Sequence, residues 1–122
     1  MLLLLHGWTA SADLNWFAVY STLAEHFRVI AMDHRGHGRG IRTFAPFRLA
    51  DCADDAASLL NELGINKAIP VGYSMGGPVA LLMWRRHRDM VNGLMLCATA
   101  GSFAHSRAER MGFLGLTGMG AL

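Results

Sequence analysis

Short apolar runs alternate with amphipathic stretches along the first hundred residues of the chain. The apolar runs predict strands buried on both faces of a parallel sheet, and they cover residues 2–5, 27–33, 67–74 and 91–99. Pro70 weakens the third of these predictions, because proline has no N–H to donate to a neighbouring strand. The alternation of strand and helix still predicts an α/β fold, with a mostly parallel sheet of about four strands and helices on both faces.

Amphipathic periods between these runs predict the helices. They cover residues 13–27, 49–63 and 75–88, and a weaker period covers residues 106–114. We expect Asp13 to be the N-cap of the first helix, and Gly64 to follow the second helix as its C-terminal cap. The glycine-rich stretch from His34 to Phe47 is predicted to be a loop.

Composition indicates a single globular domain over residues 1–122, since 52% of the residues are hydrophobic and 16% are charged. The net charge of +2 is spread over scattered cations without an aromatic platform or zinc spacing, which argues against nucleic-acid binding. Residues 1–8 are too short an apolar run to span a membrane and lack the basic segment of a signal peptide, so we expect a cytoplasmic protein. Cys52 and Cys97 are expected to be buried free thiols.

The segment "VGYSMGG", residues 71–77, places Ser74 between two glycines at the junction of a predicted strand and a predicted helix. A serine on so sharp a turn exposes its hydroxyl above the sheet, and the glycines leave room for the turn. The N-terminus of the following helix then points toward negative charge that develops on an attacked carbonyl. Gly-x-Ser-x-Gly alone also fits a tight turn with a buried serine, but the strand before it and the helix after it favour a nucleophile.

Three segments together resemble the α/β-hydrolase superfamily, in its serine-nucleophile branch. "LLLLHGW" (residues 2–8) resembles the third strand and oxyanion loop of that family, and "AMDHRGHGRG" (residues 31–40) resembles its fourth strand with the Asp-x-Arg-Gly-x-Gly loop. Residues 71–77 resemble its nucleophile elbow. By this resemblance the chain is a truncated member, an incomplete domain without the outer strands, and residues from about 100 onward resemble the start of a cap region.

The resemblance implies a role for each matching residue. Ser74 is the implied nucleophile, and the backbone N–H groups of Trp8 and Met75 form the implied oxyanion hole. The implied supporting residues of the loop and elbow are His6, Gly7, Gly72, Gly76 and Gly77. No cofactor is implied, and we predict no metal, because the His-x-x-His of His34 and His37 has no acidic or cysteine ligand nearby.

The acid and the general base of the family are not recognisable in these residues. Asp89 and Glu109 are the only acids after Ser74, and Asp89 is expected at the end of the sheet opposite the serine. His87 lies among arginines and is expected to be a solvated helix end. His105 lies where a cap would begin, which favours a structural or lid role over that of the base.

These observations favour a serine-dependent hydrolase of ester or similar acyl bonds that works through an acyl-enzyme, with this chain inactive by itself. The expected partner is a small, apolar ester or acyl compound, and unpaired sheet edges predict self-association. Serine at the elbow argues against epoxide hydrolases and haloalkane dehalogenases, while thioesterases, carbon–carbon bond hydrolases and cofactor-free peroxidases stay open. The alternative function is a non-catalytic truncated remnant or a small-molecule binding module.

Overall fold

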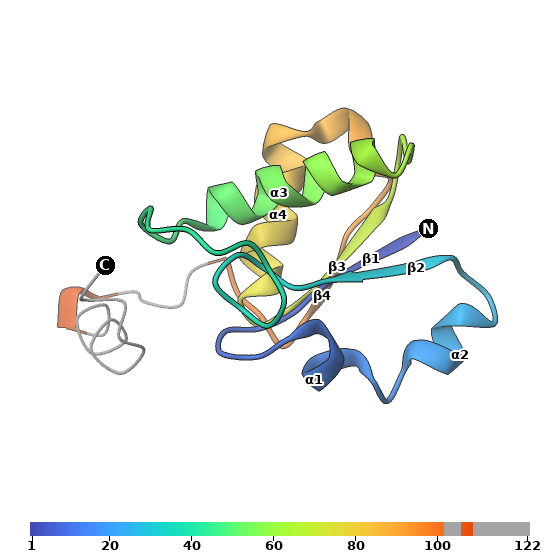
Figure 1. Ribbon diagram of the computed structural model, residues 1–122, viewed down its shortest axis with the longest axis horizontal. Helices are drawn as coiled ribbons and strands as arrows, with labels where there is room; N and C mark the ends of the chain where they lie inside the picture. Colours follow the sequence, from blue (N-terminus) through green and yellow to red (C-terminus); the bar gives the residue numbers. More distant parts are fainter. Residues whose placement is uncertain (102–105, 109–122) are drawn as a thin grey trace.

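The computed structural model describes residues 1–101 and 106–108, and four parallel strands form its sheet (Figure 1). The strands are β1 (Leu2–Leu5), β2 (Val29–Met32), β3 (Ile69–Tyr73) and β4 (Met95–Cys97), in the spatial order β2-β1-β3-β4. Leu2 is in register with Val29 on one side and with Ile69 on the other. The predicted α/β architecture and the number of parallel strands are therefore confirmed.

Helices cover both faces of this sheet, as expected. They are α1 (Ala12–Trp16), α2 (Tyr20–Ala24), α3 (Leu49–Glu62) and α4 (Gly76–Arg86), followed by a 3-10 turn, η1 (Arg88–Met90). In Figure 1, α3 and α4 lie on one face and α1 and α2 lie on the other. Because all four strands run in the same direction, their carboxyl ends meet at one edge, which is where parallel sheets bind ligands.

The core is divided by the alternation of side chains along β1. Leu3 and Leu5 pack with α3 and α4, whereas Leu2 and Leu4 pack with α1. All four leucines are buried, and burying one such side chain contributes roughly 1.5–3 kcal/mol. The prediction of a strand covered on both faces is therefore correct for β1.

The end of α3 confirms the predicted glycine cap. Gly64 has a φ of 67°, a backbone conformation that glycine adopts without steric cost. Its N–H donates to the carbonyl of Asn61 at 3.0 Å, and the N–H of Ile65 donates to the carbonyl of Leu60 at 2.8 Å. This pair of bonds is the Schellman arrangement, and the buried side chains of Leu60 and Ile65 both belong to the core beneath it.

The predicted first helix is wrong in its length, its cap and its buried face. Two short helices, α1 and α2, replace it, and Ser11 rather than Asp13 is the N-cap, because the Ser11 hydroxyl accepts a hydrogen bond from the N–H of Leu14. The helical period over residues 13–27 puts Leu14 and Phe17 on the apolar face of the predicted helix, but their side chains are 68% and 70% exposed. Trp16 is buried instead and packs against the sheet.

Pro70 lies inside β3, which has neighbours on both sides, and the hydrogen-bond directions explain why this strand tolerates it. The N–H of Ile69 donates toward β1, whereas those of Ala68 and Ser74 donate toward the chain segment that contains β4. The nitrogen of Pro70 therefore faces the β4 side. There β4 begins only opposite Val71, one residue beyond Pro70, so no strand stands opposite the missing donor.

Several elements are shorter than predicted. The fourth strand covers Met95–Cys97 rather than residues 91–99. The helix predicted over residues 75–88 is α4, which ends at Arg86 before η1. The helix predicted for residues 106–114 and the expected start of a cap region lie largely outside the described residues. Among the helices of residues 1–101 and 106–108, none is long and apolar enough to cross a membrane.

Candidate active site at the carboxyl edge of the sheet

Ser74 connects β3 directly to α4 and has a φ of 51°, in the left-handed region that side chains rarely adopt. Three hydrogen bonds hold it there. Its N–H donates to the carbonyl of Cys97 at 3.0 Å, and its own carbonyl accepts from the N–H of Gly77 at 3.0 Å and from the Thr99 hydroxyl at 2.5 Å. Hydrogen bonds to α4, to the end of β4 and to the segment after it therefore hold Ser74 in its strained backbone conformation.

The glycines around Ser74 are required by close backbone approaches. A Cβ on Gly72 would overlap the carbonyl oxygen of Gly76, and a Cβ on Gly76 would overlap the carbonyl oxygen of Leu5 in β1. A Cβ on Gly77 would overlap the Thr99 side chain. Any larger residue at these positions would push α4 away from the strands, so the glycines keep the helix N-terminus close to the sheet edge.

The loop after β1 reaches the same place. A Cβ built on Gly7 would lie 3.3 Å from the Ser74 Cβ, which means that the two residues are in contact across β1 and β3. Trp8 follows Gly7, and Met75 follows Ser74. Within the described part of the chain, the backbone N–H groups of Trp8 and Met75 have no hydrogen-bond partner. Two donors beside a serine hydroxyl are suited to bind an oxyanion, although this use of them stays a prediction.

His6 is fully buried and connects two loops at this edge. Its Nε2 accepts a hydrogen bond from the N–H of His34 at 2.9 Å, so the ring proton lies on Nδ1, which donates to the carbonyl of Gly7 at 2.7 Å. Burial, followed by the nearby His37, lowers the pKa of His6, while the Gly7 carbonyl and Asp33 oppose the shift. Both nitrogens of a neutral His6 are occupied, so its ring is not free to take the proton of Ser74.

Asp33, at the end of β2, anchors the neighbouring segments. Its carboxylate accepts from the N–H of Ala12 and from the N–H of Arg39, both at 2.7 Å. Burial by itself would raise the pKa of Asp33, but these hydrogen bonds, together with the charges of His6 and Arg39, lower it. Arg35 lies in the same loop and donates to both carboxylate oxygens of Asp55 in α3 at 2.7 Å. The loop is therefore fastened to α1 on one side and to α3 on the other.

Five aromatic rings lie against one another at the loop after β1, in tilted or edge-to-face pairs. The His6 and His34 rings lie 4.4 Å apart, and Trp8 lies 5.0 Å from His37 and 5.2 Å from Phe47. His34 is fully buried, and neither of its ring nitrogens has a hydrogen-bond partner among the described residues. Burial, followed by the charges of its histidine neighbours, lowers the pKa of His34 to about 3, so the ring is neutral near pH 7.

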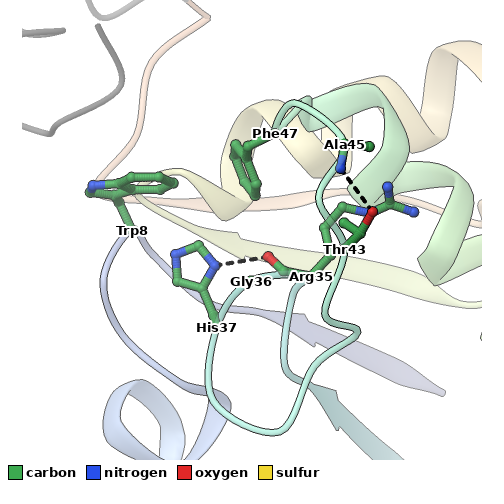
Figure 2. Close-up of a pocket in the computed structure, with 7 residues that line it drawn as sticks. All are labelled: Trp8, Arg35, Gly36, His37, Thr43, Ala45 and Phe47. Atoms are coloured by element: carbon green, nitrogen blue, oxygen red, sulfur yellow. Dashed lines mark hydrogen bonds between the residues drawn. The ribbon is translucent and has the colours of Figure 1, made fainter. Parts of the chain in front are cut away.

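A cleft of about 220 Å³ opens beside these rings (Figure 2). Trp8, His37 and Phe47 form its apolar wall, and Thr43 and Ala45 close the opposite side. Arg35 also contributes to the lining, but its guanidinium is bound to the carboxylates of α3. The described residues of the cleft therefore present aromatic surface, and the charge of Arg35 among them is paired.

The Ser74 hydroxyl has no hydrogen-bond partner in the described ranges, so no base is paired with it there. Asp89 lies in η1, whose end bonds to the start of β3, at the opposite end of the sheet as expected. His87 is the C-cap residue of α4, so the expected helix end is confirmed, but it is only partly solvated, because its Nε2 is 2.6 Å from an Asp54 oxygen and the side chain is 29% exposed. His105 lies outside the described residues.

Two further outcomes concern thiols and metals. Cys52 is buried and free as expected, but Cys97 is only half-buried, because it ends the edge strand β4. In residues 1–101 and 106–108, no three metal-ligating side chains gather into a group that could hold an ion.

The sequence analysis missed two residues at this edge of the sheet, Thr99 and Asn15. Thr99 bonds to a residue 25 positions away and Asn15 to a residue 8 positions away, and no motif marks either contact.

Comparison with known proteins agrees with this geometry. Residues 1–119 match the α/β hydrolase fold family, and the chain belongs to that family. It is 36% identical over 103 residues to a pimeloyl-[acyl-carrier protein] methyl ester esterase of Photorhabdus laumondii and 38% identical over 95 residues to a soluble epoxide hydrolase of a Corynebacterium species. These alignments cover 84% and 78% of this chain.

A solved thermophilic esterase from Thermogutta terrifontis superposes with a TM-score of 0.82 at 36% identity, over 90% of this chain and 40% of that protein. The chain spans only 37% and 33% of the lengths of the two curated relatives, so it is a partial member of the family. The expected resemblance to α/β hydrolases is confirmed, and a hydrolase lineage follows from it.

Proposed function

We propose that Ser74 is the nucleophile of a serine-dependent hydrolase acting on ester or similar acyl bonds. The observation that carries the proposal is the left-handed backbone of Ser74, with a φ of 51°, held between β3 and α4 in contact with Gly7. Such a conformation costs about 1–3 kcal/mol and persists only where the surrounding structure imposes it. Here the surrounding hydrogen bonds and glycines impose it at the edge where ligands bind.

In the proposed reaction the Ser74 oxygen attacks the acyl carbon, the alcohol leaves with a proton, and water then hydrolyses the acyl-enzyme. The N–H groups of Trp8 and Met75 stabilise the oxyanion, and each donor of this kind lowers the barrier by about 3–4 kcal/mol. His6, Gly7, Gly72, Gly76 and Gly77 hold these groups in place. No cofactor takes part in the proposed chemistry.

The proposal identifies no general base and no acid partner among the described residues. His6 and His87 are each engaged elsewhere, and His34 and His37 pack in the loop after β2. We therefore expect the 122-residue chain to react slowly at Ser74 and to turn over substrate poorly by itself. The non-catalytic alternative shares the elbow but predicts no reaction at all.

The cleft beside Trp8 supports a small substrate with an uncharged apolar part. Its wall is aromatic, and the Arg35 guanidinium that also lines it is already paired with Asp51 and Asp55. Self-association through the sheet edges is part of the proposal, because Met95 and Leu96 of the edge strand β4 are 52% and 45% exposed. The cytoplasmic location suggested by two free thiols stays a prediction.

Fluorophosphonate labelling of the 122-residue chain, measured by intact mass, tests the nucleophile. One adduct should form in the wild-type chain and in Ser58→Ala, where an exposed serine of α3 is removed, and none should form in Ser74→Ala. Circular dichroism of each variant shows whether it is folded. A folded wild-type chain that stays unlabelled would contradict the proposed nucleophile and favour the binding module.

A further inference from the structure

The orientation of the oxyanion loop depends on two side chains that approach Gly7 from opposite directions. The N–H of Gly7 donates to Oδ1 of Asn15 in α1 at 2.7 Å, and the carbonyl of Gly7 accepts from Nδ1 of His6 at 2.7 Å. Only an oxygen can accept from an N–H, which fixes which end of the Asn15 amide faces the loop. Both polar groups of Gly7 are thereby occupied.

The peptide unit that joins Gly7 to Trp8 is trans and planar. Its carbonyl and its N–H therefore point in opposite directions, and the bond from His6 to the carbonyl turns the Trp8 N–H away from the His6 ring. The preceding peptide unit, which carries the Gly7 N–H, is fixed by Asn15. With both units held, Gly7 has little freedom to rotate, although glycine is the residue that rotates most easily.

Asn15 is itself held by contacts outside the loop. Ser11 caps α1, and the N–H of Ala12 donates to Asp33 at the end of β2. A Cβ on Gly7 would lie 3.5 Å from the Asn15 oxygen and 3.3 Å from the Ser74 Cβ, so Gly7 lies against both the Asn15 amide and the serine. The short helix α1, tied to the end of β2 through Ala12, thus places a polar side chain against Gly7.

We propose that Asn15 is a positioning residue for the oxyanion hole: it fixes the peptide before Gly7, so that the N–H of Trp8 is aimed at the oxygen of the attacked carbonyl. This inference rests on the proposed role of Ser74. Preorganised donors stabilise a transition state because they need no reorientation when charge develops. Loss of the Asn15 acceptor frees the loop and should slow the chemical step while binding of the reagent is unchanged.

The test compares three variants by the rate of fluorophosphonate labelling at Ser74. Asn15→Leu keeps the shape of the side chain and removes the acceptor, Asn15→Asp keeps an acceptor, and Asn61→Leu makes the same change at an exposed position of α3. Asn15→Leu should lower the maximal labelling rate about tenfold to a hundredfold without changing the half-saturating concentration. Asn61→Leu should match the wild type, and Asn15→Asp should label faster than Asn15→Leu.

Amide hydrogen exchange at Gly7 separates positioning from loss of the fold. In Asn15→Leu the Gly7 amide should exchange faster while the amides of β1 stay protected, and in Asn15→Asp the Gly7 amide should stay protected. Wild-type labelling in Asn15→Leu, or equal slowing in both Asn15 variants, would overturn the inference and leave the nucleophile intact. A wild-type chain without labelling would overturn the proposed function, and the positioning role with it.

Discussion

Replacement of His34 by leucine should stabilise the protein at neutral pH. The side chain is fully buried and neither ring nitrogen is hydrogen-bonded within the described residues. A neutral imidazole always carries one N–H, and an unsatisfied buried donor costs about 1–3 kcal/mol. Leucine has a similar volume and no polar atom, so the net gain after repacking against the His6 ring should be about 1 kcal/mol at pH 7.

The same substitution should change the pH dependence of stability. Burial lowers the pKa of His34 from 6.5 to about 3, so below pH 6.5 the unfolded chain binds a proton that the folded chain does not. The free energy of unfolding therefore falls as the pH falls, by about 1.4 kcal/mol per pH unit for this one group. The leucine variant lacks this loss, so its advantage over the wild type should grow between pH 6.5 and pH 4.5.

Urea denaturation followed by tryptophan fluorescence, at half-unit steps from pH 7.5 to pH 4.5, measures both effects. His26→Leu is the matched control, because His26 is exposed after α2 and the change removes a histidine without touching the core. The reasoning would be refuted by a His34→Leu variant that is less stable than the wild type at pH 7. It would also be refuted if the two proteins lost stability in parallel as the pH fell.

Two further substitutions test the elbow and the helix pair behind it. Gly76→Ala should destabilise the fold by roughly 3 kcal/mol in urea denaturation, because the new methyl group would overlap the Leu5 carbonyl. A methyl group in Gly93→Ala would meet only the Ile69 side chain, at an ordinary contact distance of 4.0 Å, so that variant should be nearly neutral. Asp54→Asn should lower the melting temperature at pH 7, because the hydrogen bonds from Arg86 lower the pKa of Asp54 to about 2. That difference should persist above pH 4 and shrink as the pH falls toward 2, and an effect independent of pH would contradict the ion-pair explanation.

The sheet could be predicted from the sequence because each strand is encoded by adjacent residues and the same pattern recurs in the other strands. Each strand of a covered parallel sheet is a continuous apolar run, and Leu2 to Leu5 packs as such a run should. The turn at the serine could be predicted for a related reason. Other backbone atoms approach Gly72 and Gly76 so closely that neither position allows a side chain. These features depend on near neighbours or on strict steric limits.

The first helix could not be predicted in the same way, because its position is set by distant contacts. Ala12 is tied to Asp33, 21 residues away, and the buried tryptophan packs on the sheet, so Leu14 and Phe17 turn outward against the helical period. The histidine stack is equally non-local, since His6 and His34 are 28 residues apart. No spacing rule in the sequence connects such pairs.

Among the residues that the structure describes, three other than glycine have positive φ angles, and all three follow the carboxyl ends of strands. Thr9 comes after β1 with a φ of 56°, Ser74 after β3 with 51°, and Ala98 after β4 with 47°. The backbone strain of these three residues thus lies at one rim of the sheet, while the buried leucines of β1 lie in its body. As the temperature rises, this rim should relax before the sheet melts, so Ser74 should lose its reactivity toward fluorophosphonate below the melting temperature of the protein.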